Sequence, residues 1–177
     1  MSDFWVFGYG SLIWNPGFDH LERKRARLHG LHRSLCIYSW VHRGTQAKPG
    51  LVLGLDKGGS CHGVAMRASH EKKETIVDYL RARELVTAVY LECWRKVTLE
   101  SGETVMALVY RVDQTSPQYA DGLSLDSQTE IVRTAVGGSG HNIDYVQSTV
   151  AAMKREGIRD HSLEYIDRKL RSKAQAD

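Results

Sequence analysis

The stretch FWVFGYGSLIWNPG, residues 4–17, is the most informative part of this chain of 177 residues. It begins with apolar side chains in a row at residues 5–7, which is typical of a strand covered on both faces. Gly8 and Gly10 then flank Tyr9, which predicts a sharp bend or a close approach of a ligand to the backbone. Successive N–H groups in such a bend can form a concave site for a carboxylate or an oxyanion. A plain tight turn explains the same spacing, so both interpretations stay open.

The glycines of this stretch do not match the common nucleotide-binding motifs. No G-x-x-x-x-G-K-[ST] run occurs, which excludes a P-loop by motif. A dinucleotide-binding fingerprint needs a third glycine three residues after Gly10, and Ile13 occupies that position. The net charge of +3 is too small to argue for nucleic acid, and the basic run at residues 23–27 is typical of one solvated face. We therefore expect no nucleotide-binding fold and no nucleic-acid partner.

Length and composition indicate one ordinary globular domain. Hydrophobic residues make up 42% of the chain and charged residues 25%, and 177 residues bury enough surface to need no disulfide or metal. Three widely separated cysteines favour a reducing compartment. The N-terminus lacks a basic region before a long apolar core, and no apolar run approaches the length of a membrane span. We expect a cytoplasmic protein without a membrane partner, and the sequence does not specify its oligomeric state.

A metal site is not expected either. No Cys-x-x-Cys pair occurs, and His29 and His32 lie in a segment that reads as a strand. Side chains three positions apart on a strand point to opposite faces, so these two histidines cannot easily share a metal.

The rest of the chain reads first as short strands and then as helices. We expect one or two strands over 24–40, short strands at 51–55 and 63–67 about a turn at Gly58-Gly59, and a hairpin of 87–99 with 104–112. Ser69 is a candidate N-cap for a helix ending near Leu85. Helical periodicity returns from Ser127, with a glycine break at 137–140, a glycine stop at 157 and a last helix over 161–172. The class is α+β: a small, mostly antiparallel β-barrel with flanking helices. We expect a single domain over 1–177, with the helical segment of about 127–172 packed on it.

Glu84 is the candidate that periodicity alone selects. It follows Val77 by seven positions and Leu80 by four, so its carboxylate lies on the apolar face of the helix. It also lies at the helix C-terminus, where the macrodipole disfavours negative charge. Burial and the dipole both raise a carboxylate pKa, which suits a base at neutral pH. The neighbouring Arg81 and Arg83 support the alternative of a salt-bridged carboxylate at a solvent-exposed helix end.

Other polar residues give weaker signals. Ser11 has no G-x-S-x-G elbow around it, so its hydroxyl is expected to cap the turn or contact a ligand rather than act as a nucleophile. His42 is either an acid–base residue or a solvated turn histidine. Arg43, beside it, either binds a carboxylate or is an exposed turn residue without a binding role.

Taken together, these segments resemble the γ-glutamylcyclotransferase superfamily, specifically its ChaC-like, glutathione-specific branch, over about residues 4–167. The resemblance implies a compact β-barrel with flanking helices, no cofactor, and cleavage of glutathione to 5-oxoproline and cysteinylglycine. It also assigns Glu84 as the catalytic acid/base. Arg43 and Tyr145 are further candidates for substrate contact. The matching residues, in chain order, are 6–14 (VFGYGSLIW), 43–45 with 49–50, 63–65, Arg83-Glu84, and the glycine-rich turn leading to Asn142 and Tyr145. The substrate-binding loop that the resemblance implies is Val6, Phe7, Gly8, Tyr9, Gly10 and Ser11.

This chemistry fits the residues present. The substrate's own α-amine attacks its γ-carbonyl, so no protein nucleophile is required, but a base is required because an ammonium group has no lone pair. Two alternatives stay open: a cyclotransferase for other γ-glutamyl amines, and a non-catalytic γ-glutamyl-binding regulator of cation transport.

Overall fold

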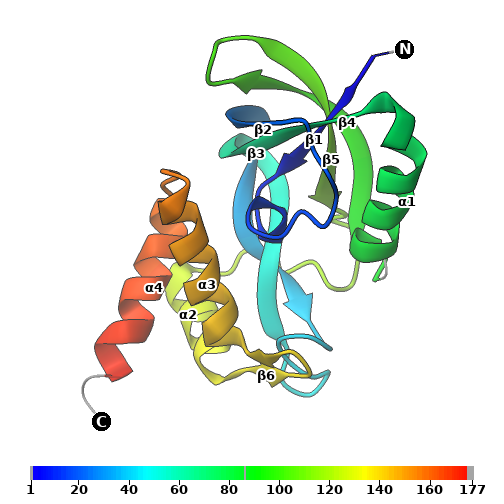
Figure 1. Ribbon diagram of the computed structural model, residues 1–177. Coiled ribbons are helices and arrows are strands. Elements are labelled where there is room, and N and C mark those ends of the chain that lie inside the picture. The colour runs from blue at the N-terminus through cyan, green and yellow to red at the C-terminus, as the bar shows by residue number, and fades with distance from the viewer. Residues whose placement is uncertain (1, 86, 175–177) are drawn as a thin grey trace. The chain divides into compact units, whose positions relative to one another are not determined.

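Five strands close into a barrel in the computed structural model of the protein, which describes residues 2–85 and 87–174 (Figure 1). Their order around the barrel is β1-β3-β2-β4-β5. The ladders β1–β3, β2–β4 and β4–β5 are antiparallel, and β1–β5 is parallel. The predicted mostly antiparallel barrel is therefore confirmed. The strands are β1 (Phe4–Gly8), β2 (Glu22–Ser39), β3 (Gly50–Ala68), β4 (Tyr90–Leu99) and β5 (Thr104–Val112).

Helices and a small hairpin complete an α+β fold, as predicted. Within residues 2–85 and 87–174, one helix, α1, lies between β3 and β4 in the sequence, and three helices follow β5. No helix within the described part of the chain is both long enough and apolar enough to cross a membrane. The elements are the 3-10 turns η1 (Ser11–Ile13) and η2 (His70–Lys72), the helices α1 (Lys73–Glu84), α2 (Leu125–Thr134), α3 (Asn142–Arg155) and α4 (His161–Ala174), and the strands β6 (Val136–Gly137) and β7 (Gly140–His141).

The contacts divide the chain into two compact units. The first comprises Met1–Arg33 and Gly54–Ser116, and the second comprises Ser34–Leu53 and Pro117–Asp177. The boundaries fall within β2 and β3, so each of these two long strands belongs to both units. A single domain over 1–177 with the helical segment packed on it stays a prediction.

β3 is the main departure from the predicted elements. We expected two short strands separated by a turn at Gly58-Gly59, whereas one strand runs from Gly50 to Ala68. Gly58 and Gly59 have φ angles of 94° and 64°, so the chain does leave the extended conformation there. Because glycine adopts positive φ without steric cost, the two residues bend the strand without ending it. The prediction of a strand break was therefore wrong.

The helix that carries Glu84 ends as predicted, but it begins later: α1 starts at Lys73 with Lys72 as its N-cap, and the predicted cap Ser69 belongs to the 3-10 turn before it. The Ser69 hydroxyl accepts a hydrogen bond from the Glu71 N–H, which caps η2 and leads the chain into α1. Ile76, Val77 and Leu80 are the buried side chains of α1, and Leu85 is its C-cap. The face of α1 that carries these apolar side chains therefore points inward as far as the last turn of the helix.

Gly63, in the first unit, is a glycine whose replacement should be costly. A Cβ at Gly63 would lie 2.4 Å from the Gly8 carbonyl oxygen and 2.7 Å from Cζ of Phe7. We expect Gly63→Ala to destabilise the protein by about 1–3 kcal/mol, because β1 or β3 must move to admit the methyl group. Urea unfolding measures the loss. Gly138→Ala is the control, since its nearest atom is the Val41 carbonyl oxygen at 3.3 Å. Equal unfolding midpoints for the two variants would contradict the close approach.

Candidate active site

The bend after β1 is built from backbone rather than from exposed side chains. Val6 and Phe7 are buried, and the β1–β3 register places Phe7 opposite Ala65 and Gly8 opposite Val64. The side chains of β1 therefore fill the core, and the chain turns into η1 directly after Gly8-Tyr9-Gly10. A 3-10 turn leaves its first N–H groups without partners inside the turn, so this bend offers backbone donors.

Arg83 joins this bend to the end of α1. Its Nη2 donates a hydrogen bond to Ser11 Oγ at 2.7 Å, and its Nη1 donates to the Asn15 carbonyl oxygen at 2.6 Å. Nη1 also donates to the Tyr79 hydroxyl oxygen at 3.1 Å. One guanidinium group thus holds the last turn of α1 to η1 and to the residues that follow it.

Glu84 lies beside this guanidinium and is mostly sheltered from water. Its side chain is 16% exposed, and Arg83 Nε lies 3.3 Å from Glu84 Oε1. Burial raises the pKa of the Glu84 carboxyl, and the positive charge of Arg83 opposes the rise. Both interpretations of the sequence therefore hold in part: the carboxylate is largely shielded from water, and it is ion-paired. A carboxyl with a raised pKa beside a donor-rich bend can take up a proton and return it.

A second carboxylate, which sequence reasoning missed, behaves in the opposite way. Glu92 on β4 accepts hydrogen bonds from Arg81 at 2.8 and 2.9 Å and from the Tyr110 hydroxyl at 3.0 Å. The Arg81 bonds lower the pKa of Glu92, so this group stays ionised. Burial, together with the charges of Glu92 and Glu84, raises the pKa of Tyr110. The pKa of Glu92 is lowered and that of Glu84 is raised. Glu84 is therefore the carboxyl suited to proton transfer.

Arg33 is a second residue that sequence reasoning missed. It is 7% exposed and donates from Nε to the Tyr9 carbonyl oxygen at 2.6 Å and from Nη2 to the His62 carbonyl oxygen at 2.5 Å. Its buried guanidinium thus ties the bend to β3. The alternation of Leu31, Arg33 and Leu35 places the arginine on the inward phase of the strand, and that signal would have identified it.

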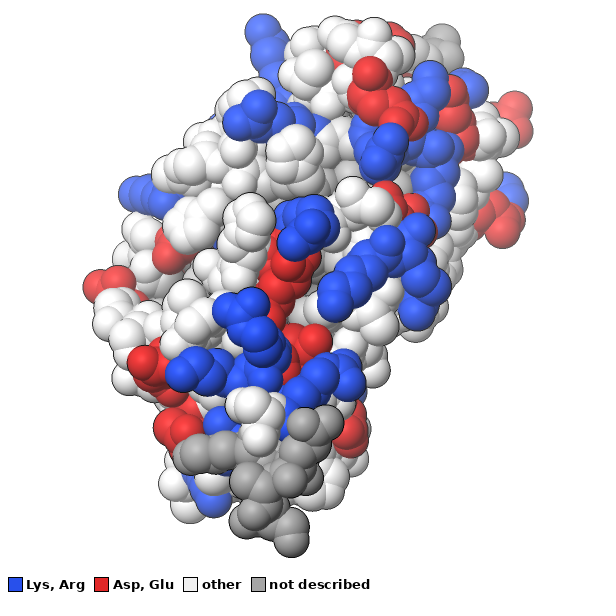
Figure 2. Space-filling view, turned by 90° about the vertical axis from the view of Figure 1, so that its left-hand side faces the viewer, with Lys and Arg blue, Asp and Glu red and all other residues white. Residues whose placement is uncertain are grey.

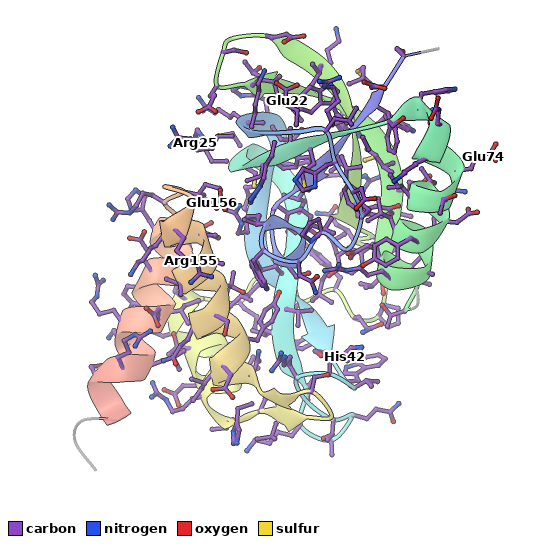
Figure 3. All side chains as sticks on the ribbon, viewed as in Figure 1. Glu22, Arg25, His42, Glu74, Arg155 and Glu156 are labelled. Atoms are coloured by element: carbon purple, nitrogen blue, oxygen red, sulfur yellow. The ribbon has the colours of Figure 1, made fainter. Side chains whose placement is uncertain are left out.

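The remaining candidates, Arg43 and Tyr145, belong to the second unit, where the structure brings them together. The Arg43 guanidinium carbon lies 5.6 Å from the centroid of the Tyr145 ring, and its Nη1 donates to the His141 carbonyl oxygen at 3.2 Å. The Tyr145 hydroxyl accepts a hydrogen bond from the Leu53 N–H at 3.0 Å. His42 lies in the loop beside β6 (Figure 3), with its Nδ1 3.0 Å from Ser139 Oγ. The substrate contacts expected of Arg43 and Tyr145 stay predictions.

Two further features bear on the chemistry. In the described ranges, no group of three or more His, Cys, Asp or Glu side chains is arranged to hold a metal ion. No disulfide joins the three cysteines, all of which are described: Cys36 and Cys61 are buried, and Cys93 is half-buried.

Comparison with a solved structure defines the fold. A crystal structure of a yeast γ-glutamyl cyclotransferase specific to glutathione superposes with a TM-score of 0.86, covers 97% of both chains and is 22% identical. The barrel and its helices are therefore those of a γ-glutamylcyclotransferase fold.

Sequence comparison defines the family. A family model described as ChaC-like protein matches residues 4–173, and the chain belongs to that family. A glutathione-specific γ-glutamylcyclotransferase of Escherichia coli (strain K12) is 35% identical over 159 residues, which are 90% of this chain and 69% of that protein. The glutathione-specific γ-glutamylcyclotransferase 1 of Danio rerio is 34% identical over 151 residues, or 82% and 76% of the two chains. These relatives are enzymes by name, and the resemblance seen in the sequence is confirmed.

Proposed function

We propose that the protein is a glutathione-specific γ-glutamylcyclotransferase, which converts glutathione into 5-oxoproline and cysteinylglycine. The names of the E. coli and zebrafish relatives support this substrate. The observation that carries the proposal is the sheltered Glu84 carboxyl with its raised pKa, linked through Arg83 to Ser11 in the bend.

In the proposed reaction, Glu84 moves a proton between two nitrogens of the substrate. It takes the proton from the α-ammonium group, and the freed amine attacks the γ-carbonyl carbon to form the bond that closes the five-membered ring. The ring nitrogen then gives up its second proton and the amide bond to the cysteinyl nitrogen breaks. Both protons pass through Glu84 in turn to that departing nitrogen, which leaves as an ammonium group. Atoms and charge balance within the substrate and one carboxyl group, so the step needs no oxidant, reductant or cofactor.

The loop from Val6 to Ser11 is proposed to hold the γ-glutamyl half. Since Val6 and Phe7 are buried, their contribution is the placement of the backbone, and the N–H groups of the bend would bind the α-carboxylate or the developing oxyanion. Arg83 and Ser11 add fixed polar groups at the same place. Arg43 and Tyr145 are kept as candidates for the cysteinylglycine half.

A small-molecule substrate also fits the surface. Lys and Arg side chains lie among Asp and Glu side chains on the face shown in Figure 2. With a net charge of +3 for the whole chain, this mixed surface favours neither nucleic acid nor an anionic membrane as partner. Cysteines without disulfides suit a reducing environment, and we propose that the enzyme acts in the cytoplasm.

The direct test is incubation of the purified protein with glutathione, followed by detection of 5-oxoproline and cysteinylglycine by mass. γ-Glutamyl-alanine is the comparison substrate, since it keeps the γ-glutamyl group that reacts and replaces cysteinylglycine by alanine. Product from glutathione at a much higher kcat/KM supports the proposal. Equal rates would assign a broader cyclotransferase, and binding of glutathione without product would assign a non-catalytic binder.

The electrostatic role of Arg83 has its own signature in the pH profile. Because a base must be ionised to act, kcat/KM should fall as pH drops through the raised pKa of Glu84. Since the Arg83 charge lowers that pKa, Arg83→Gln should move this acid limb to higher pH. The profile of kcat/KM against pH measures the shift, with Arg25→Gln, an exposed arginine on β2, as the charge-matched control. If the acid limb of the Arg83→Gln profile stayed in place or moved to lower pH, the proposed effect of Arg83 on the pKa of Glu84 would be wrong.

A further inference from the structure

The first unit contains a basic pocket separate from the residues of the candidate active site. It has a volume of about 340 Å³. The residues that line it come from β2, β3, β4 and β5, and they are His29, Gly30, Leu31, Lys57, Arg95 and Arg111.

The chain of β2 leaves the regular extended conformation beside the pocket. The β2–β4 register runs from Ala26 opposite Leu99 to Leu28 opposite Val97. Two residues later Gly30 has a φ of 83°, and a Cβ at this position would meet no atom within 4 Å. The strand thus turns away in a conformation that favours glycine, and the space beside it stays open.

The lining is strongly cationic. Lys57, Arg95 and Arg111 reach the pocket from three different strands, and none of the six lining residues is acidic. The nearest carboxylates in sequence are already engaged. Asp56 accepts hydrogen bonds from the Gln114 side chain at 2.7 Å and from the Lys57 N–H at 2.8 Å. Asp113 accepts from the N–H and the hydroxyl of Thr115, and the charge of the nearby Arg111 also contributes to lowering the pKa of its carboxyl.

One donor in this lining lacks an acceptor. Arg111 Nε is buried, and among the described residues it is the buried side-chain nitrogen or oxygen without a hydrogen-bond partner. Arg111 Nη1 reaches the Val112 carbonyl oxygen only at 3.3 Å. A buried donor without an acceptor is costly, so the hydrogen-bonding capacity of the Arg111 guanidinium is not satisfied within the described part of the chain.

The pocket opens on the side of the β4–β5 ladder opposite to the Glu92–Tyr110 pair. Glu92 is paired with Tyr110, and the adjacent pair is Leu91 with Arg111. Side chains of adjacent pairs point to opposite faces of a sheet, so Arg111 points away from the network that neighbours Glu84. A ligand held by Arg111 is therefore not the γ-glutamyl group proposed to lie beside Glu84.

We propose that this pocket binds a small, multiply charged anion of the phosphate class, either free phosphate or the phosphoryl group of a small metabolite. Two guanidinium groups offer forked pairs of donors that match phosphate oxygens, and Lys57 adds a third positive charge. The proposal does not depend on the reaction at Glu84.

The test titrates the full chain with inorganic phosphate, pyrophosphate and glycerol phosphate at low ionic strength, followed by calorimetry and by the shift in Tm. We expect saturable binding at one site and a rise in Tm with ligand concentration. Arg95→Gln and Arg111→Gln should each weaken binding about tenfold or more, because each removes a charge-assisted contact.

Lys96→Gln is the matched control. It removes the same charge from the neighbouring, exposed position of β4, whose side chain points to the opposite face. It should change the affinity less than twofold. Tighter binding of glycerol phosphate would identify a metabolite site, and tighter binding of the inorganic ions would identify a site for free phosphate. Absence of saturable binding by all three probes, or equal weakening in Lys96→Gln, would overturn the proposal.

Discussion

Glu84→Gln is expected to lower kcat for 5-oxoproline formation by about 10²–10⁴-fold, the usual cost of removing a general acid–base group. An amide of the same shape cannot take the proton from the substrate ammonium. It fills the same space in the last turn of α1, so the fold and the affinity for glutathione should persist. Steady-state turnover and calorimetric binding of glutathione to the variant measure the two effects separately.

The control for this variant lies on the same helix. Glu74 is exposed on α1 and faces away from the barrel strands (Figure 3). Glu74→Gln makes the same chemical change without touching the bend, and its turnover should equal that of the unaltered protein. Near-normal turnover of Glu84→Gln would remove Glu84 from the mechanism.

The same variant has a predictable effect on stability. Burial raises the pKa of Glu84 in the folded state above its unfolded value, so ionisation of this group disfavours folding. Glu84→Gln should therefore be as stable as the parent protein or more stable at neutral pH. The difference should shrink as pH falls through the raised pKa and vanish below the unfolded value of about 4.3. Urea unfolding at a series of pH values tests the sign, and a destabilised variant at neutral pH would contradict the burial argument.

Features that depend on local sequence could be predicted. The bend after β1 follows from glycines next to an apolar run, the cap of η2 from Ser69, and the inward carboxylate from the spacing of Glu84 behind Leu80. Each of these depends on the neighbouring few residues, where propensity and periodicity act directly.

Features that depend on pairing between distant strands could not be predicted from the sequence. Glycines at 58–59 look alike in a turn and in a bent strand, and only the partners of β3 distinguish the two. The pKa values of Glu92 and Tyr110 depend on the register that places these residues opposite each other. The basic pocket depends on three strands that meet where β2 leaves its regular path. A polar residue in such places is explained by its neighbours in space, which periodicity does not specify.

Arg33→Met is expected to destabilise the protein by about 2–4 kcal/mol and to lower kcat/KM at least tenfold in the molecules that remain folded. The buried guanidinium donates to the carbonyl oxygens of Tyr9 and His62, and hydrogen bonds to a charged group contribute about 1.5–3 kcal/mol each. Methionine fills the space but leaves both oxygens without these donors. The bend is then free to shift, and a displacement of about 1 Å is enough to misplace a reacting group.

The control separates this role from loss of charge in general. Arg27 lies on the same strand, is exposed, and bonds only to Ser60 Oγ among the described contacts, so Arg27→Met should change stability by less than about 0.5 kcal/mol. Arg33→Lys should recover part of the stability but less of the activity, since a single ammonium cannot reproduce the forked geometry that spans Tyr9 and His62. Urea unfolding and kcat/KM corrected for the folded fraction provide the two readouts. If Arg33→Met lost stability but kept full kcat/KM when folded, Arg33 would support the barrel without placing the bend, and the backbone donors would owe their position to Arg83 alone.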